Sequence, residues 1–213
     1  NATQFSRQLS SLPYYDTQEE DVSLRKDFPQ FNKFFDDTGI LKNVGQTPLV
    51  YTRNNLYIKL EGENYSGSIK DRVALYLLLK KLQDGIIEDG ISLIIATSGS
   101  YGVSMFFMKK IIETYFNISI NLAILTPETY QDKPGITILK ENKLNEYSIG
   151  ADVDFEKMTD GILYTDGKFD STLKIAKRLG AAKGAYYVDQ QYDESHVEAH
   201  RSTAEELAQQ HPR

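Results

Sequence analysis

Short apolar runs and longer segments of helical periodicity alternate along the chain from about residue 48 onward. Short apolar runs beside turn residues are typical of buried strands, and apolar positions that recur every three or four residues are typical of helices. Strands or extended runs are predicted within residues 44–52, 54–61, 92–99, 120–127, 147–155 and 184–191, and helices over 68–85, 100–116, 128–142, 168–180 and 194–210. Because alternating strands and helices build βαβ units, the pattern predicts an α/β fold with open, twisted parallel sheets and helices on both faces.

Three segments give a less regular pattern. Residues 1–42 mix polar, charged and aromatic residues without a clear period, so we expect an extension with one or two short helices around residues 24–35. Pro134 and Gly135 should interrupt or delay the helix predicted over 128–142. The segment TDGILYTDGK, residues 159–168, is predicted as turn-rich surface.

Composition excludes several classes of chemistry and of partner. The chain has 213 residues, no cysteine and a formal net charge of -6. Disulfides, thiolate catalysis and cysteine-bound metals are therefore excluded, and nucleic acid and anionic membranes are disfavoured as partners because both need a basic face. No apolar run is long enough to span a bilayer and the N-terminus has no apolar signal core, so we expect a cytoplasmic protein.

The segment YSGSIKDR, residues 65–72, places a lysine at a predicted helix start. Ser68 can cap this helix, and Asp71 stands three residues later in the position of a capping box. The partial positive charge of a helix N-terminus, together with burial, would lower the pKa of Lys70 and favour the neutral amine that Schiff-base chemistry requires. The alternative is an ordinary surface lysine whose ammonium reaches solvent.

A second segment, ATSGSYG at residues 96–102, runs from an apolar strand through a small-residue loop into a helix. Ligands of open α/β sheets bind at the carboxyl ends of strands, and the N–H groups of a helix start suit a carboxylate or a phosphate. Such a loop is also a common strand-to-helix turn. It follows Lys70 by about the length of a βαβ unit, so both segments could face one crevice.

From residue 44 to the end, the chain resembles the cysteine synthases. These are pyridoxal-phosphate enzymes with the fold of the tryptophan synthase β-subunit. The resemblance rests on five motifs that occur in the order and rough spacing of that family: GQTPL (45–49), KLEGENYSGSIKDR (59–72), ATSGSYGV (96–103), GADV (150–153) and DQQYDESHVEAH (189–200).

The resemblance implies a role for each matching residue. Lys70 matches the lysine that forms the Schiff base with the cofactor and then removes the α-proton. The other implied contacts are Thr97, Ser98 and Gly99 with the substrate carboxylate, Ser100 with the cofactor, and Tyr101, Gln191 and Tyr192 with the substrate. The implied reaction is β-replacement on an O-activated serine, as in the synthesis of cysteine or of 2,3-diaminopropionate.

The sequence also departs from the family. Ser100 stands where the family usually has asparagine, Tyr101 replaces a threonine, and Tyr192 replaces a phenylalanine. The Gly-rich loop that holds the cofactor phosphate is absent, so we expect an inactive piece of a larger protein, incomplete relative to the family's two-domain fold. A fragment, one half of a split enzyme, and a non-catalytic interaction module that has lost the cofactor remain open.

The resemblance further implies a division into domains and a partner. The expected parts are an N-terminal extension (1–43), first strands of the large domain (44–62), a small α/β domain (63–149) and the start of a truncated large domain (150–213). Truncation should leave an unpaired sheet edge, so we expect a homodimer or a complementing chain.

His196 and His200 are spaced i, i+4, which can place two imidazoles on one helix face for a metal. A solvated polar helix explains the same pattern, and no third ligand is evident in the sequence. We therefore expect no metal site.

Overall fold

The computed structural model describes residues 14–15, 22–52, 55–149 and 159–211. The chain forms two compact units: residues 73–196 make one, and residues 1–72 with 197–213 make the other. The GADV motif (150–153) and most of the strand predicted over 147–155 lie outside the described residues. The predicted boundaries at residues 43, 62 and 149 stay predictions.

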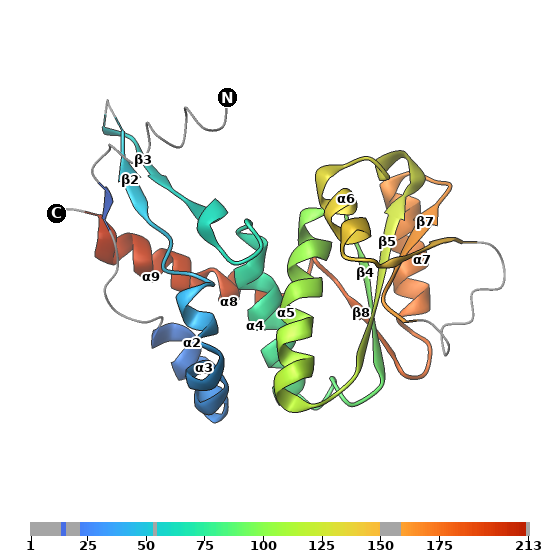
Figure 1. The fold of residues 1–213 in the computed structure, drawn as a ribbon, viewed down its shortest axis with the longest axis horizontal. Helices are drawn as coiled ribbons and strands as arrows, with labels where there is room; N and C mark the ends of the chain where they lie inside the picture. Colours follow the sequence, from blue (N-terminus) through green and yellow to red (C-terminus); the bar gives the residue numbers. More distant parts are fainter. Residues whose placement is uncertain (1–13, 16–21, 53–54, 150–158, 212–213) are drawn as a thin grey trace. The chain divides into compact units, whose positions relative to one another are not determined.

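The unit of residues 73–196 is built on a five-stranded sheet in which every neighbouring pair is parallel (Figure 1). Its strand order is β6-β7-β5-β4-β8. The strands are β4 (Ile91–Ala96), β5 (Ile120–Pro127), β6 (Asn145–Ser148), β7 (Gly161–Thr165) and β8 (Ala185–Val188). The predicted parallel α/β sheet is confirmed.

Helices cover both faces of this sheet, as predicted. On one face, Ala123 and Leu125 of β5 form a core cluster with Ala176 of α7 (Phe169–Leu179). On the opposite face lie α5 (Ser100–Phe116) and α6 (Pro134–Glu141), and a Cβ at Gly102 of α5 would meet both Ile124 of β5 and a leucine of α6. Alternate side chains of one strand therefore separate the two helix layers.

One sequence prediction is wrong within this sheet. Residues 161–165, predicted as turn-rich surface, form β7 between β5 and β6. Ile162 and Leu163 are fully buried, which is expected for a strand covered on both faces.

One predicted helix is delayed, as expected from Pro134 and Gly135, and another is divided into two. The helix expected over 128–142 starts as the short 3-10 turn η5 (Glu128–Tyr130), and the α-helix is delayed to Pro134, its first residue. The helix expected over 194–210 is divided at His200 into α8 (Ser195–Ala199) and α9 (Arg201–Gln210).

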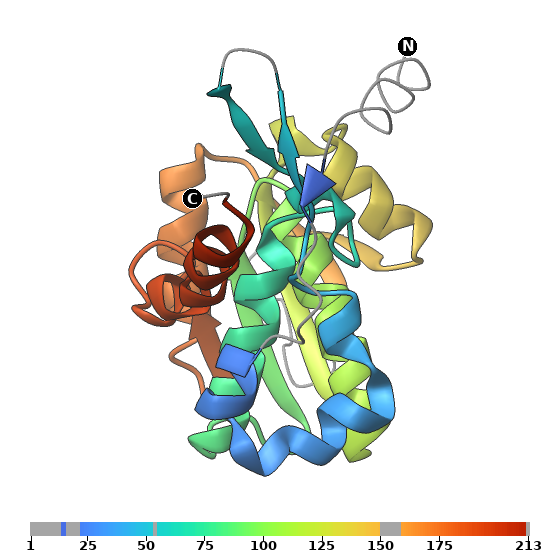
Figure 2. The ribbon, with the colours of Figure 1, turned by 90° about the vertical axis from the view of Figure 1, so that its left-hand side faces the viewer.

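The other unit contains a small antiparallel sheet in the order β1-β2-β3. Figure 2 shows β2 (Leu49–Tyr51) and β3 (Tyr57–Lys59) side by side, and β1 is Tyr14–Tyr15. The predicted short helices before them are α2 (Val22–Asp27) and α3 (Asn32–Thr38), joined by the 3-10 turn η1 (Pro29–Phe31). Further 3-10 turns are η2 (Ile40–Lys42) and η4 (Glu61–Glu63).

The helix α4 (Lys70–Gln83) begins in this unit and continues into the other. Among the described residues, no helix combines the length and the apolar character needed to cross a bilayer.

Candidate functional site

The loop after β4 carries exposed hydroxyls on a fixed backbone. The N–H of Thr97 donates to the carbonyl of Leu125 at 3.0 Å and so extends the β4–β5 ladder by one residue. The buried Oγ1 of Thr97 accepts from the N–H of Gly99 at 3.2 Å. Ser98 and Ser100 are exposed on either side of Gly99, so their hydroxyls are open to a ligand.

Gly99 and Gly135 bring the loop and the start of α6 into backbone contact. Gly99 has φ 141° and ψ -76°, a conformation that only glycine adopts readily. A Cβ on Gly135 would lie 2.6 Å from the carbonyl carbon of Gly99, so a side chain there would displace the loop. Sequence reasoning missed this role of Gly135, although the Pro134-Gly135 pair at a delayed helix start was the signal for it.

Gly99 is also the N-cap of α5, and no side chain caps the helix there. The first-turn N–H groups of α5 therefore lack a side-chain acceptor from their N-cap residue, as expected for a site that receives an anion.

The segment after β8 reaches the same edge of the sheet through Gln190. Its Nε2 donates to the carbonyl of Ala96 at 2.6 Å. The predicted substrate residues Gln191 and Tyr192 are exposed, and their N–H groups donate to Oδ1 of Asp189. Sequence reasoning missed the contact of Gln190, and the roles of Gln191 and Tyr192 stay predictions.

Tyr101 enters the interior of the unit. It is 2% exposed, and its hydroxyl has no hydrogen-bond partner among the described residues. Its ring centre lies 5.8 Å from that of His196. Burial, with the nearby charges of Asp193 and Asp189, raises the pKa of Tyr101, so the buried group is a neutral phenol.

Lys70 is the first residue of α4, in the other unit. Oγ of Ser68 accepts from the N–H of Lys70 at 3.1 Å, so Ser68 satisfies one N–H at the helix start. The buried carboxylate of Asp71 accepts from the N–H of Ser66 at 2.6 Å and also from its hydroxyl. The capping-box expectation for Asp71 and Ser68 is thus replaced by a contact with Ser66.

Within the described part of the chain, the half-buried Lys70 side chain makes no hydrogen bond or ion pair. Its ammonium does act on His200, whose pKa is lowered by burial and by the charges of Lys70 and Arg72. Among the described residues, no carboxylate therefore pairs with the amine of Lys70.

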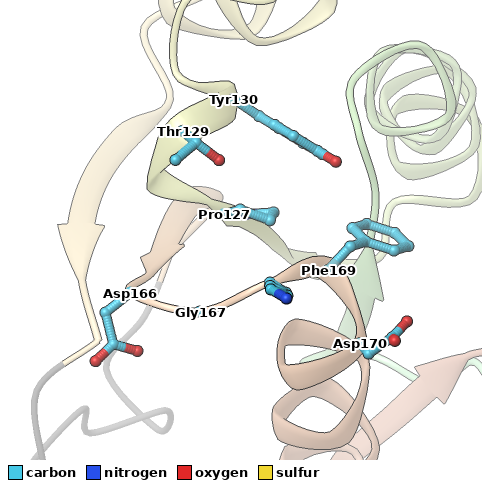
Figure 3. Close-up of a pocket in the computed structure, with 8 residues that line it drawn as sticks. Pro127, Thr129, Tyr130, Asp166, Gly167, Phe169 and Asp170 are labelled. Carbon is cyan, nitrogen blue, oxygen red and sulfur yellow. The ribbon is translucent and has the colours of Figure 1, made fainter.

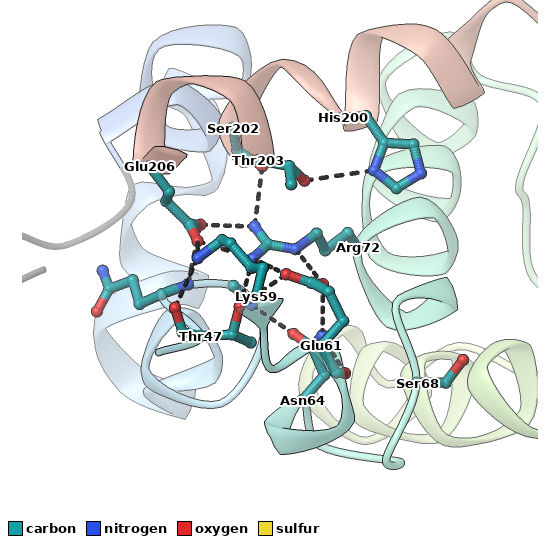
Figure 4. Close-up of polar contacts among 12 residues, drawn as sticks. Thr47, Lys59, Glu61, Asn64, Ser68, Arg72, His200, Ser202, Thr203 and Glu206 are labelled. Carbon is teal, nitrogen blue, oxygen red and sulfur yellow. Dashed lines mark hydrogen bonds and ion pairs between the residues drawn. The ribbon is translucent and has the colours of Figure 1, made fainter. Parts of the chain in front are cut away.

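Two residues after Lys70, Arg72 is the centre of a buried ionic network (Figure 4). Its guanidinium contacts Glu61 through Nε and Nη2, each at 2.8 Å, and Glu206 of α9 through Nη1 at 2.5 Å and Nη2 at 2.8 Å. Lys59 of β3 also pairs with Glu206, at 2.7 Å. The network ties the start of α4 to β3, η4 and α9.

Uncharged groups complete the network. Oγ1 of Thr47 donates to Glu61 at 2.6 Å, Asn64 donates to Glu61 at 2.9 Å, and the N–H of Gln46 donates to Glu206 at 2.9 Å.

These contacts decide the charge states in the network. Burial alone would raise the pKa of Glu61, but hydrogen bonds from Arg72 and Thr47 lower it to about 2. The same balance, dominated by Arg72 and Lys59, lowers the pKa of Glu206. Burial opposes the charge of Arg72, but the two carboxylates raise its pKa. Both glutamates are therefore ionised above acidic pH.

The two histidines considered for a metal have other surroundings. The His196 ring lies against Tyr101, and Nδ1 of His200 lies 3.3 Å from the hydroxyl of Thr203. In the ranges that the structure describes, no group of three or more histidine, aspartate and glutamate side chains is arranged for a metal ion.

Lys70 belongs to one unit, whereas Thr97, Ser98, Gly99, Ser100, Tyr101, Gln191 and Tyr192 belong to the other. The structure brings the end of β4 together with Gln190 after β8. The single crevice that would join Lys70 to this sheet edge stays a prediction.

Comparison with known proteins agrees with this fold. A family model described as pyridoxal-phosphate dependent enzyme matches residues 40–213. Among solved structures, an O-acetylserine dependent cystathionine β-synthase from Helicobacter pylori matches with a TM-score of 0.61 and 19% identity, over 79% of this chain and 52% of the other.

Two further structures are similar. A hydrogen sulfide-producing enzyme from Fusobacterium nucleatum has a TM-score of 0.60 and 26% identity, over 80% of this chain and 52% of that enzyme. An O-ureido-L-serine synthase has a TM-score of 0.59 and 23% identity, over 80% and 50%. The chain thus spans about half the length of each of these structures.

Proposed function

The chain belongs to the family of pyridoxal-phosphate dependent enzymes, and on this premise we propose that it is part of an enzyme that binds the cofactor through Lys70. The proposed reaction is β-replacement on an O-activated serine, of the kind that cysteine synthases and 2,3-diaminopropionate synthases perform. The similar structures include an enzyme described as O-acetylserine dependent and an O-ureido-L-serine synthase, and these descriptions support an activated serine as the substrate class.

The proposal rests on one observation, the absence of a carboxylate partner for the Lys70 amine among the described residues. The backbone of Lys70 is held by Ser68 on one side and by the Arg72 network on the other. A Schiff base requires a primary amine that can lose its proton. A lysine already paired with a buried carboxylate would resist this loss.

The residues present fit pyridoxal phosphate in part. The amine of Lys70 suits its aldehyde, and the exposed hydroxyl of Ser100 suits an oxygen of its ring. The start of α5 has no side-chain cap, and the N–H groups of such a helix start suit an anion. When bound, the cofactor withdraws electrons from the α-carbon of an attached amino acid, which makes the α-proton acidic.

In this proposal each residue has a defined task. The exposed hydroxyl of Ser98 holds the substrate carboxylate. Thr97 and Gly99, whose N–H groups already bond within the protein, fix the shape of the loop around it. The Nζ of Lys70 receives the proton from the substrate Cα. Gln191 and Tyr192 close the pocket around the carboxylate, and Tyr101 limits its depth.

The partners are also part of the proposal. The small-molecule partner is an amino acid, and the protein partner is a second copy or a complementing chain. Because this sequence contains no Gly-rich phosphate loop, we propose that these residues by themselves turn over little substrate.

The test is covalent trapping. The chain and the full-length protein are incubated with pyridoxal phosphate, reduced with borohydride, digested and analysed by mass spectrometry. The expected result is an adduct on the peptide that contains Lys70, lost in Lys70→Ala and retained in Lys42→Ala, which removes an exposed lysine elsewhere in the same unit. A full-length protein with labelling spread over surface lysines and unchanged by Lys70→Ala would end the proposal.

A non-catalytic module with the same fold is the second candidate. It is favoured by Ser100 and by Tyr101, whose buried ring occupies the start of α5. Turnover of O-acetylserine with sulfide by the full-length protein excludes the module. An unmodified Lys70 together with a stably bound protein partner would favour it.

A further inference from the structure

A pocket of about 630 Å³ lies at the carboxyl ends of β5 and β7, within the unit of residues 73–196 (Figure 3). It is separate from every residue assigned above to the cofactor or the substrate. The pocket is lined by Pro127, Thr129, Tyr130, Asp166, Gly167, Lys168, Phe169 and Asp170.

The strand connections explain why a pocket forms here. The strands β5 and β7 are parallel neighbours. After β5 the chain turns to α6 on one face of the sheet, whereas after β7 it turns to α7 on the opposite face. The two loops diverge, and this is the topological switch point at which open α/β sheets bind ligands.

One side of the pocket is aromatic. Figure 3 shows the rings of Tyr130 and Phe169 on the same side. Their centres are 6.4 Å apart and their planes differ by 23°. The ammonium of the exposed Lys133 lies 3.5 Å from the centre of the Tyr130 ring, which is a cation–π contact at the surface.

The remaining lining carries both signs of charge. Asp166 and Asp170 offer carboxylates and Lys168 offers an ammonium. Lys168 is the N-cap of α7, and no side chain caps the helix there. The N–H groups of residues 171 and 172 bond to the carbonyl of Lys168, so those of Phe169 and Asp170 have no acceptor within the helix.

We propose that this pocket binds a free amino acid with an aromatic or large apolar side chain, as the zwitterion. The side chain lies against Tyr130 and Phe169, and the carboxylate group against Lys168 and the start of α7. The ammonium group lies against one of the two carboxylates, Asp166 or Asp170, which stand on opposite sides of the pocket (Figure 3). A purely cationic ligand would leave Lys168 and the two N–H groups unused, and a purely anionic ligand would face two carboxylates. Only a ligand with both charges matches the whole lining. This inference does not depend on Lys70 or on the cofactor.

The experiment is a calorimetric titration of the full, cofactor-free chain with three probes of one shape. L-Phenylalanine carries both charges, phenethylamine lacks the carboxylate and 3-phenylpropionate lacks the ammonium. L-Phenylalanine is expected to bind about tenfold or more tighter than either analogue, because a charge-assisted hydrogen bond is lost in each.

Charge variants separate the two halves of the pocket. Asp166→Asn combined with Asp170→Asn should weaken the binding of L-phenylalanine and phenethylamine about tenfold. The binding of 3-phenylpropionate should stay equal or become tighter, because two repelling carboxylates are removed. Lys168→Gln should weaken L-phenylalanine and 3-phenylpropionate instead. Asp132→Asn removes an exposed carboxylate that does not line the pocket and should change nothing. Circular dichroism checks that each variant is folded.

Three results would overturn the inference. They are the absence of binding by L-phenylalanine, equal binding of all three probes, and binding that survives the pocket variants but is lost in Ser98→Ala. The last result would place the amino acid at the loop after β4 and so support the proposed function while it removes this second site. Conversely, failure to trap the cofactor on Lys70 would leave the pocket result intact.

Discussion

Replacement of Arg72 by methionine should strongly destabilise the unit that contains it. Methionine keeps much of the side-chain length but removes the guanidinium that joins Glu61 and Glu206. The side chains of these three residues are only 2%, 15% and 7% exposed, in that order. Two buried carboxylates would lose their main counter-charge, and water could replace it only partly.

The magnitude follows from this burial. Removal of one partner from a buried pair typically destabilises by about 3–5 kcal/mol, because a buried charge remains uncompensated. Lys59 still neutralises part of the charge on Glu206, so we expect about 3 kcal/mol, or roughly a hundredfold decrease in the folding equilibrium constant.

The assay is urea unfolding of the wild type and of Arg72→Met, followed by circular dichroism and by tyrosine fluorescence. Two signals are needed because separate unfolding of the two units would give transitions that do not coincide. The double variant Arg72→Met with Glu61→Gln is the control. It removes the charge stranded on Glu61 and keeps Glu206 as the partner of the buried Lys59, so it should recover much of the lost stability.

The pH dependence of the stability difference between the wild type and Arg72→Met can refute this reasoning. Because the pKa of Glu61 falls from 4.5 to about 2 on folding, its pairing stabilises the protein above about pH 4.5, and this contribution is lost as the pH falls through about 2. The stability gap between wild type and Arg72→Met should therefore narrow over this window. A loss below about 1 kcal/mol at pH 7, the value of an exposed ion pair, or a gap independent of pH would refute the reasoning.

Three further predictions concern the candidate site. Gly135→Ala should destabilise by about 1–3 kcal/mol in urea unfolding, because its Cβ would meet the backbone of Gly99, whereas Gly62→Ala, with open space around its Cβ, should have little effect. His200 should titrate below 6.5 in an NMR pH series, and its pKa should rise in Lys70→Gln because one repelling charge is removed; an unchanged pKa would mean that the ammonium of Lys70 lies farther away. Tyr101→Phe should leave the unfolding free energy equal or higher, since the hydroxyl that it removes is buried without a partner among the described residues; a loss above about 1 kcal/mol would reveal a hydrogen bond to that hydroxyl.

Local patterns predicted most of the sheet and its helices. Some elements could be predicted because each combines a clear apolar pattern with a glycine or proline boundary. They are the strands near residues 92–99 and 120–127 and the helix over 100–116. The strand β7 could not be predicted from its own sequence. Its first residue, Gly161, belongs to one Asp-Gly pair, and a second Asp-Gly pair follows its last residue. Only pairing with the neighbouring strands β5 and β6 makes so short a segment a strand.

Some features of the candidate site could likewise be predicted from the sequence, and others could not. The loop from Thr97 to Ser100 was predictable because its turn is encoded by its own residues. The Arg72 network was not, because Glu206 is 134 positions away in the sequence and its pairing depends on the fold. The contact of Gln190 with Ala96 illustrates a finer limit: adjacent glutamines are equivalent in composition, and only the path of the backbone after β8 decides which of them faces the neighbouring strand.

The interrupted path of the chain through its two units has a consequence for folding during synthesis. Residues 73–196 are contiguous, whereas the other unit needs residues from both ends. At roughly 5–20 residues per second, the ribosome adds Glu206 about 7–27 s after Arg72. During that interval Glu61 is the only one of its two carboxylate partners that Arg72 can contact. The parallel sheet can therefore be complete before α9 is available to pair with the start of α4, where Lys70 lies.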